Sequence, residues 1–253
     1  MGVIRSLILA FATYSRIPMP RVEWSAENRK YAMCFFPLVG MAVGAALWLW
    51  LMLCDALALG VLLKGAVGAV IPLLVTGGIH MDGFMDTVDA LASCQPRERK
   101  LEILKDSRVG AFAAMACCGY MLAMAGLLGE AKTGDGPSVG LCFVLSRALS
   151  AWAMAAFQGA RPDGMLDSFA RAAQRRLVTA SSGIYAALCL MAWALLGGWT
   201  ALMCAATAII CLLCYRRMAY GQFGGVTGDL AGWFSQVTEL ALIAAVILGG
   251  KMI

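Results

Sequence analysis

The chain has 253 residues, of which 61% are hydrophobic and only 14% are charged, and its mean hydropathy is +0.79. Soluble globular domains carry about 45–50% apolar and about 25% charged residues. The composition therefore excludes an ordinary soluble domain and indicates an integral membrane protein. The net charge of +5 does not indicate a nucleic-acid partner, because the placement of basic residues matters more in a membrane protein than their sum.

The first segment, residues 2–17, is apolar but is interrupted by Arg5 and is too short to cross a bilayer. A transmembrane helix needs about 20 apolar residues, so we expect a re-entrant or interfacial helix here. A signal peptide is the alternative, but no small-residue cleavage site follows cleanly.

Seven longer apolar runs follow, and most of them approach the length of a membrane span. The second run is short, so we expect its helix to begin near Leu57 or to extend past Ile79. The pattern predicts an all-α fold, a single membrane-embedded domain over residues 1–253 with about seven transmembrane helices. The runs cover residues 31–53, 65–79, 111–129, 138–159, 178–197, 199–219 and 230–250.

Lysine and arginine residues gather in every second loop, as the positive-inside rule describes. The rich segments precede the first run and follow the second, fourth and sixth runs, whereas the opposite loops contain Lys64, Lys132 and Lys251. We therefore predict a cytoplasmic N-terminus and cytoplasmic positions for residues 80–110 and 161–176.

The sequence HMDGFMDTVDA at residues 80–90 places three carboxylates at the end of the second apolar run. Asp82, Asp86 and Asp89 have the spacing i, i+4, i+7, which puts them on one narrow face of a helix. Grouped carboxylates repel one another unless cations hold them, and hard oxygen ligands suit Mg²⁺ or Mn²⁺. A solvated acidic helix end explains poorly why the charges share one stripe at a membrane boundary, where charge is costly. We predict a metal site.

His80 precedes these carboxylates and has two interpretations. On a helix that included it, His80 would lie about 160° away from the carboxylate face. It could join the site only if the helix began after it. A structural histidine bonded to backbone at the helix entry is an equal alternative.

The loop PRERKLEILKDSRVGAF, residues 96–112, carries a second charged group. Asp106 could supply a fourth carboxylate to the metal site, and Lys105 and Arg108 could bind phosphate oxygens. A solvated cytoplasmic face explains the loop almost equally well. We expect Arg97, in its solvated part, to be dispensable.

Two further features indicate an anionic ligand. FGGVTGDLAG, residues 223–232, is a glycine-rich turn that leads to Asp229 and a helix, and backbone amides of such turns can bind phosphate. Arg147 lies inside an apolar run, where an arginine indicates a functional role with an anionic substrate or an aspartate as its partner. Together these residues predict a metal-dependent membrane phosphotransferase acting on a diphosphate.

The strings RIPMP, TGGIHMDGFMDTVDA, LEILKDSRVGAF, ARPDGM and FGGVTGD resemble, in this order, the cobalamin synthase family, from residue 16 to about residue 239. The resemblance implies an adenosylcobinamide-GDP ribazoletransferase, which joins α-ribazole or its 5′-phosphate to adenosylcobinamide-GDP and releases GMP. It implies Mg²⁺ as cofactor and an integral inner-membrane enzyme, in contact with the lipid bilayer, whose active site faces the cytoplasm. The sequence leaves open whether the protein forms a homo-oligomer.

The resemblance also implies roles for individual residues. Asp82, Asp86, Asp89 and Asp106 would bind metal and act with Arg108 in catalysis. The substrate-binding residues would be His80, Lys105, Ser107, Arg147, Gly225, Thr227 and Asp229, the last serving the nucleotide or a second metal. Two positions depart from the family pattern: Ala90 replaces a typical glycine, and Gln236 replaces an expected glutamate, which leaves Glu239 as the acidic residue of the last helix.

Two other classes of protein also use clustered aspartates. A CDP-alcohol phosphotransferase or a prenyl-diphosphate enzyme is one alternative, although the Ala-Arg pair and the downstream aspartate spacing of the former are absent. A cation transporter is the other. It should carry its aspartates at mid-membrane, often on broken helices, whereas these lie at the end of an apolar run.

Overall fold

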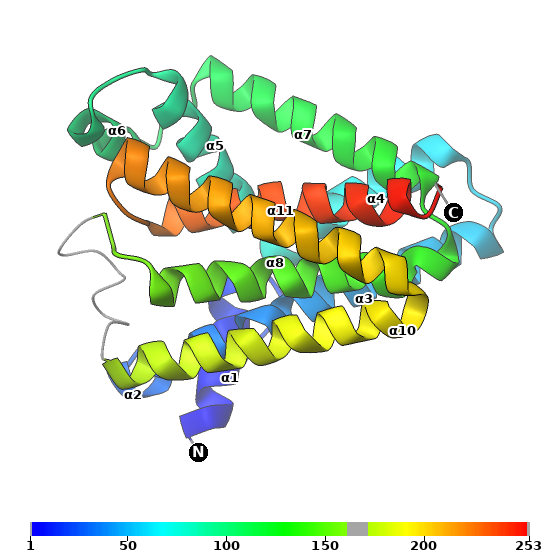
Figure 1. Ribbon diagram of the computed structural model, residues 1–253, viewed down its shortest axis with the longest axis horizontal. Coiled ribbons are helices and arrows are strands. Elements are labelled where there is room, and N and C mark those ends of the chain that lie inside the picture. The colour runs from blue at the N-terminus through cyan, green and yellow to red at the C-terminus, as the bar shows by residue number, and fades with distance from the viewer. Residues whose placement is uncertain (1, 161–171, 252–253) are drawn as a thin grey trace.

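The computed structural model describes residues 2–251 except 161–171, and the described part is a bundle of long helices (Figure 1). Arg161, Arg171 and most of the ARPDGM motif lie outside the described residues. Within the described part no strand is found, and the only β-pairing is the isolated bridge between Gly159 and Val226. The predicted all-α class is confirmed.

The helices agree with the predicted apolar runs to within a few residues. In chain order they are α1 (Gly2–Tyr14), α2 (Ala26–Arg29), η1 (Ala32–Phe35), α3 (Phe36–Ala56), α4 (Val61–Thr76), α5 (Ile79–Ala92), α6 (Arg97–Ile103), α7 (Ala111–Glu130), η2 (Thr133–Asp135), α8 (Gly136–Ala156), α10 (Ala172–Met218), η3 (Ala219–Phe223) and α11 (Gly228–Gly249).

Among the described residues, six helices are long and apolar enough to cross a membrane, or seven if the bent pair α4–α5 counts as one span. The prediction of about seven spans is therefore confirmed, and α1 is shorter than a span, as expected. Two of the spans belong to α10, because the chain leaves helical geometry at Gly197 and runs back along the bundle (Figure 1).

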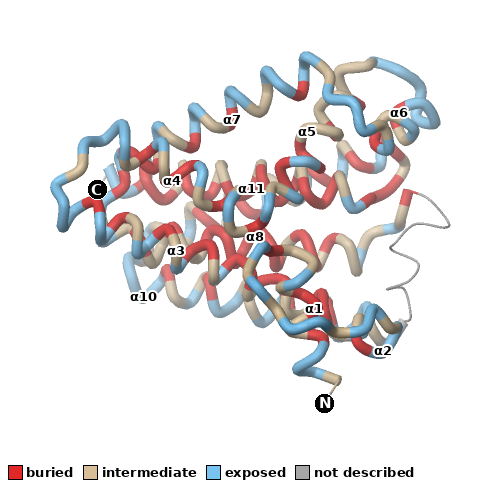
Figure 2. Tube along the Cα trace, turned by 180° about the vertical axis from the view of Figure 1, so that it is seen from behind, coloured by how far each residue is buried: buried red, intermediate tan, exposed pale blue. Residues whose placement is uncertain are grey.

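The centre of the bundle is formed by α8 and α11. In their spanning windows 61% and 67% of the residues are buried, against 22% in α7. Figure 2 shows the same contrast, with buried positions concentrated on α8 and α11 and exposed positions along α7. The exposed apolar side chains of the outer helices would face lipid, because a bilayer offers them an apolar solvent.

A bend of 99° separates α4 from α5. Gly77 and Gly78 form it with φ values of 66° and 78°, which residues with side chains rarely adopt. Arg16 supports the bend, since its backbone N–H donates to the Val75 carbonyl oxygen at 2.8 Å. The expected second span therefore ends at Thr76, and the acidic motif continues on a separate helix.

The helices α5 and α11 cross at two glycines. A Cβ atom on Gly83 would come within 2.7 Å of the Asp229 carbonyl oxygen, and one on Gly232 within 3.1 Å of the His80 carbonyl oxygen. The two backbones can approach this closely because neither glycine carries a side chain. The crossing brings the acidic motif against the end of the glycine-rich turn.

Replacing Gly83 by valine should lower the thermal stability of the purified protein, because the new side chain must displace the backbone of α11. Overpacking of this kind costs about 1–3 kcal/mol. Gly126→Val is the matched control, because nothing lies within 4 Å of a Cβ atom built at this helical glycine. The measurement is the unfolding temperature of both variants in one detergent. Equal unfolding temperatures would contradict the close crossing.

Candidate active site

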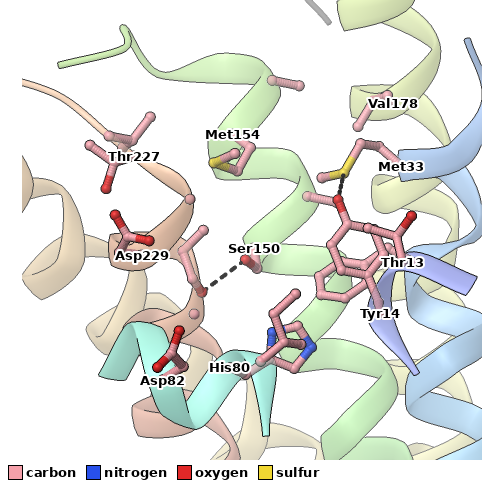
Figure 3. Close-up of a pocket in the computed structure, with 18 of the residues that line it drawn as sticks. Thr13, Tyr14, Met33, His80, Asp82, Ser150, Met154, Val178, Thr227 and Asp229 are labelled. Atoms are coloured by element: carbon pink, nitrogen blue, oxygen red, sulfur yellow. Dashed lines mark hydrogen bonds between the residues drawn. The ribbon is translucent and has the colours of Figure 1, made fainter. Parts of the chain in front are cut away.

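A cavity of about 390 Å³ lies between α1, α3, α5, α8, α10 and the start of α11. Its volume falls in the range of small-molecule sites, roughly 300–1,000 Å³. Figure 3 shows Asp82 and Asp229 on one side of this cavity and the rings of Tyr14 and His80 on the other. The cavity therefore has a polar side at the acidic motif and an aromatic side opposite it.

Two carboxylates, those of Asp82 and Asp229, line the polar side, and the carboxylate of Asp86 lies within electrostatic range of both. Asp82 and Asp86 lie one turn apart on α5, and Asp229 occupies the first turn of α11. The charge of Asp86 interacts with those of Asp82, Asp229 and Asp89. Within the described chain, no lysine, arginine or hydrogen-bond donor pairs with the side chain of Asp82 or Asp86. A bound cation would relieve the repulsion that this arrangement creates.

The donor set fits Mg²⁺ or Mn²⁺ in one particular mode of binding. No three His, Cys, Asp or Glu side chains of the described residues converge tightly enough to hold a metal ion by themselves. Mg²⁺ seldom uses a complete protein cage, because it keeps several waters and takes one or two carboxylates together with substrate phosphates. Asp82, Asp86 and Asp229 offer only hard oxygen donors, so they match this open mode.

Asp89 lies on the predicted stripe but has a different task. Its two carboxylate oxygens accept hydrogen bonds from the backbone N–H groups of Gly110 at 2.6 Å and Ala113 at 2.9 Å. Gly110 is the N-cap residue of α7. The carboxylate therefore caps α7 from α5 and complements the positive end of that helix. Its contacts do not support the predicted role in metal binding or catalysis.

Asp106 is also separate from the acidic cluster. Its carboxylate accepts hydrogen bonds from Arg108 Nε at 3.0 Å and Nη2 at 2.7 Å, and Arg108 lowers the pKa of Asp106 to about 2. Both residues line a second cavity, on the loop side of Asp89. The structure therefore does not assemble the four-carboxylate site that the sequence suggested. Lys105 and Ser107 are exposed on the same loop and line neither cavity.

Arg147 is buried inside the bundle, with 1% of its surface exposed. Its Nη1 donates to Glu239 Oε1 at 2.6 Å, and the Ser146 hydroxyl donates to the same oxygen at 3.2 Å. The expected partner, an aspartate or an anionic substrate, is therefore corrected to a glutamate on α11. Arg147 does not line the main cavity, so the pair ties α8 to α11 behind it.

The glycine-rich turn borders the cavity, as predicted. The Val226 N–H donates to the Gln158 carbonyl oxygen at 2.9 Å, which holds the turn against the end of α8. Gly225 lies behind the cavity wall, where a Cβ atom would come within 2.5 Å of that carbonyl oxygen. Thr227 accepts from the Leu230 N–H at 3.2 Å and caps α11. Thr227 and Asp229 line the cavity, whereas Gly225 shapes the turn.

Two basic residues of α6 contact the segment 222–224, and sequence reasoning missed these contacts. The Arg97 guanidinium packs on Gly224, where a Cβ atom would come within 2.0 Å of Nη1. Lys100 is buried, and its Nζ donates to Gln222 Oε1 at 2.5 Å. The i, i+3 spacing of Arg97 and Lys100 places both on one face of α6 and could have indicated that they contact the same segment. Arg97 nevertheless remains exposed, as its position in the solvated part of the loop predicted.

His80 follows neither of its two predicted alternatives. The helix α5 begins at Ile79, so His80 lies inside it and away from the carboxylate face. Its ring packs at 5.3 Å from the Phe36 ring and 6.2 Å from the Tyr14 ring, between centroids. Its Nε2 atom is buried without a hydrogen-bond partner in the described structure.

These features define a polytopic helical membrane protein with a carboxylate cluster beside a ligand-sized cavity at one end of the bundle. The chain belongs to the cobalamin-5-phosphate synthase family, whose model matches residues 6–247. It is 40% identical to the adenosylcobinamide-GDP ribazoletransferase of Lachnoclostridium phytofermentans, covering 100% of this chain and 97% of the relative. It is 33% identical to the protein of that name from Desulfitobacterium hafniense, covering 96% of each chain. No solved structure matches it significantly. The family resemblance predicted from the motifs is confirmed.

Asp89→Ala should lower the stability of the protein, because two backbone N–H groups at the start of α7 lose their acceptor. Loss of a helix cap costs about 1 kcal/mol, which corresponds to about 2–4 °C in unfolding temperature for a chain of this size. Asp106→Ala is the matched control, since Asp106 pairs with an exposed arginine and caps no long helix. Thermal unfolding of the two purified variants tests this. An unchanged unfolding temperature for Asp89→Ala would contradict the capping role.

Proposed function

We propose that this chain is an adenosylcobinamide-GDP ribazoletransferase, which joins adenosylcobinamide-GDP to α-ribazole or its 5′-phosphate and releases GMP. Relatives with this name align over nearly their whole length, and the family description agrees. One structural observation carries the proposal. Asp82 and Asp86 meet Asp229 beside a cavity of about 390 Å³, large enough for part of a small-molecule substrate.

The reaction is a substitution at phosphorus. A ribose hydroxyl oxygen of the acceptor bonds to the phosphorus that is attached to cobinamide, the bond from this phosphorus to the GMP oxygen breaks, and the hydroxyl proton passes to a base. Negative charge spreads over the phosphoryl oxygens, so catalysis depends mainly on positioning and on charge stabilisation. Bound Mg²⁺ would neutralise this charge and hold the diphosphate.

The chain's own residues divide this work. Asp82, Asp86 and Asp229 would hold the metal ion together with the diphosphate, because Asp82 and Asp229 line the polar side of the cavity and the charge of Asp86 interacts with both. The N-terminus of α11 lies at the same place, and its dipole favours phosphate anions. Arg175 also lines the cavity, so an acceptor carrying a 5′-phosphate would gain a charged contact that α-ribazole lacks.

We infer that the carboxylate end of the bundle faces the cytoplasm of a bacterial inner membrane. This end carries α6, the loop that follows it and the last turn of α10. Its basic residues are Arg97, Arg99, Lys105, Arg108, Arg216 and Arg217. The opposite end, with the C-terminus, carries Lys64, Lys132 and Lys251. The contrast follows the positive-inside rule.

A cation transporter is the second candidate function. The acidic helix belongs to a broken helix pair, α4–α5, and discontinuous helices are typical of ion-coupled transporters. A transporter would bind cations without cleaving a diphosphate. The CDP-alcohol phosphotransferases are not favoured, because the family match covers nearly the whole chain.

Asp82→Asn and Asp86→Asn should each reduce GMP release from adenosylcobinamide-GDP and α-ribazole at least about a hundredfold, the usual loss when one charge-stabilising group is removed. A chelator should stop the wild-type reaction, and added Mg²⁺ should restore it. Glu98→Gln is the control, because it removes an exposed carboxylate on α6. Turnover is normalised to folded protein and measured with α-ribazole and with its 5′-phosphate.

Two outcomes would count against this proposal. A wild-type protein that binds Mg²⁺ but releases no GMP with either acceptor would refute the transferase activity and favour the transporter. Near-normal turnover in both aspartate variants would show that Asp82 and Asp86 do not hold an essential metal ion. This result would not count against the transferase activity itself.

A further inference from the structure

We propose that the aromatic side of the cavity binds the base of the acceptor nucleoside and selects a planar base with few polar atoms, such as a benzimidazole, over a purine. This inference rests on the proposed function, and it assigns the two sides of one cavity to different parts of the acceptor. The argument depends on ring geometry, on one unpaired nitrogen and on the apolar wall.

Three aromatic rings from different parts of the chain meet on this side of the cavity. Tyr14 ends α1, Phe36 begins α3 and His80 lies in the first turn of α5. The ring centroids of Tyr14 and Phe36 are 4.6 Å apart, and that of His80 lies 5.3 Å from Phe36. Aromatic side chains favour flat ligands through stacked and edge-to-face contacts, so this wall suits a planar heteroaromatic ring.

Among the described residues of this wall, one side-chain polar atom is buried without a hydrogen-bond partner. Tyr14 donates its hydroxyl to Met33 Sδ at 3.2 Å, Thr13 donates to the backbone of its own helix at 2.7 Å, and Ser150 donates to the backbone of α11 at 3.1 Å. His80 is 6% exposed, and its Nε2 atom has no partner among the described residues. Buried polar atoms normally have a hydrogen-bond partner, which a ligand ring nitrogen would supply.

Apart from Arg175, which would contact the acceptor's 5′-phosphate, the wall beside the rings is apolar and sets the selectivity. Ala151, Met154 and Val178 line the cavity beside the rings, and they offer no hydrogen bonds. A benzimidazole nucleoside has one unsubstituted ring nitrogen, which matches the single His80 Nε2 atom. A purine carries further ring nitrogens and exocyclic groups, and these would lose water without finding partners.

This placement also orients the sugar. With the base at Tyr14 and His80, the ribose would point toward Asp82 and Asp229 on the opposite side (Figure 3). The acceptor hydroxyl would then lie at the carboxylate cluster, where the metal-bound diphosphate of the donor would lie. The much larger corrinoid need not enter the cavity, because only its diphosphate must reach these carboxylates.

The test compares steady-state kinetics with two acceptors, α-ribazole and the α-riboside of adenine. The wild type should prefer α-ribazole by more than about tenfold in kcat/KM. His80→Phe keeps an aromatic ring but removes the proposed hydrogen bond from Nε2 to the base. It should therefore raise the KM for α-ribazole about tenfold and leave the KM for adenosylcobinamide-GDP unchanged. Met154→Gln adds a polar group to the wall and should narrow the preference between the acceptors.

Trp199→Phe is the control, because Trp199 is exposed beside the turn at Gly197 and should alter neither KM. An unchanged acceptor KM in His80→Phe, or a change confined to the donor KM, would overturn the proposal. Equilibrium dialysis of labelled α-ribazole against wild type and His80→Phe gives a second readout. If neither the wild type nor any variant releases GMP, the proposed transferase function is refuted. Equal binding of α-ribazole by the wild type and His80→Phe would separately refute the base site.

Discussion

The contact between the backbones of α5 and α11 is the constraint on which the candidate site depends. Gly83 and Gly232 remove the side chains that would separate the two helices. Two carboxylates from the first half of the chain thereby approach a third near its end, at the N-terminus of α11. Such convergence of like charge is unfavourable in isolation, and the cation of the proposed function, bound together with an anionic substrate, would relieve it.

Other charged residues hold the helices around this crossing together. Arg147 and Glu239 tie α8 to α11, and Asp89 ties α5 to α7. Removing one member of a buried ion pair leaves an uncompensated charge and costs about 3–5 kcal/mol. Loss of activity in an Arg147 variant would therefore follow from a disturbed bundle, without any direct contact between Arg147 and phosphate.

Features set by neighbouring residues could be predicted from the sequence, and features set by distant contacts could not. Span length and the stripe of Asp82 and Asp86 follow from local apolar length and helical spacing, and both are found in the structure. The partners of Asp89 and Arg147 come from helices 21 and 92 residues away, which spacing cannot reveal. The bend could have been predicted, because the adjacent Gly77 and Gly78 end an apolar run. Gly83 was a second such signal, since a glycine inside a helix often marks close packing.

The central claim is that α5 and α11 together form one metal site, and binding of Mn²⁺ in the presence of pyrophosphate tests it most directly. Electron paramagnetic resonance titrations would compare the wild type with Asp82→Asn, Asp229→Asn and Asp106→Asn. If the site spans the crossing, Asp82→Asn and Asp229→Asn should each weaken Mn²⁺ binding more than about tenfold, and Asp106→Asn should bind like the wild type. Wild-type affinity in Asp229→Asn, or a loss of binding confined to Asp106→Asn, would contradict a site shared by these two helices.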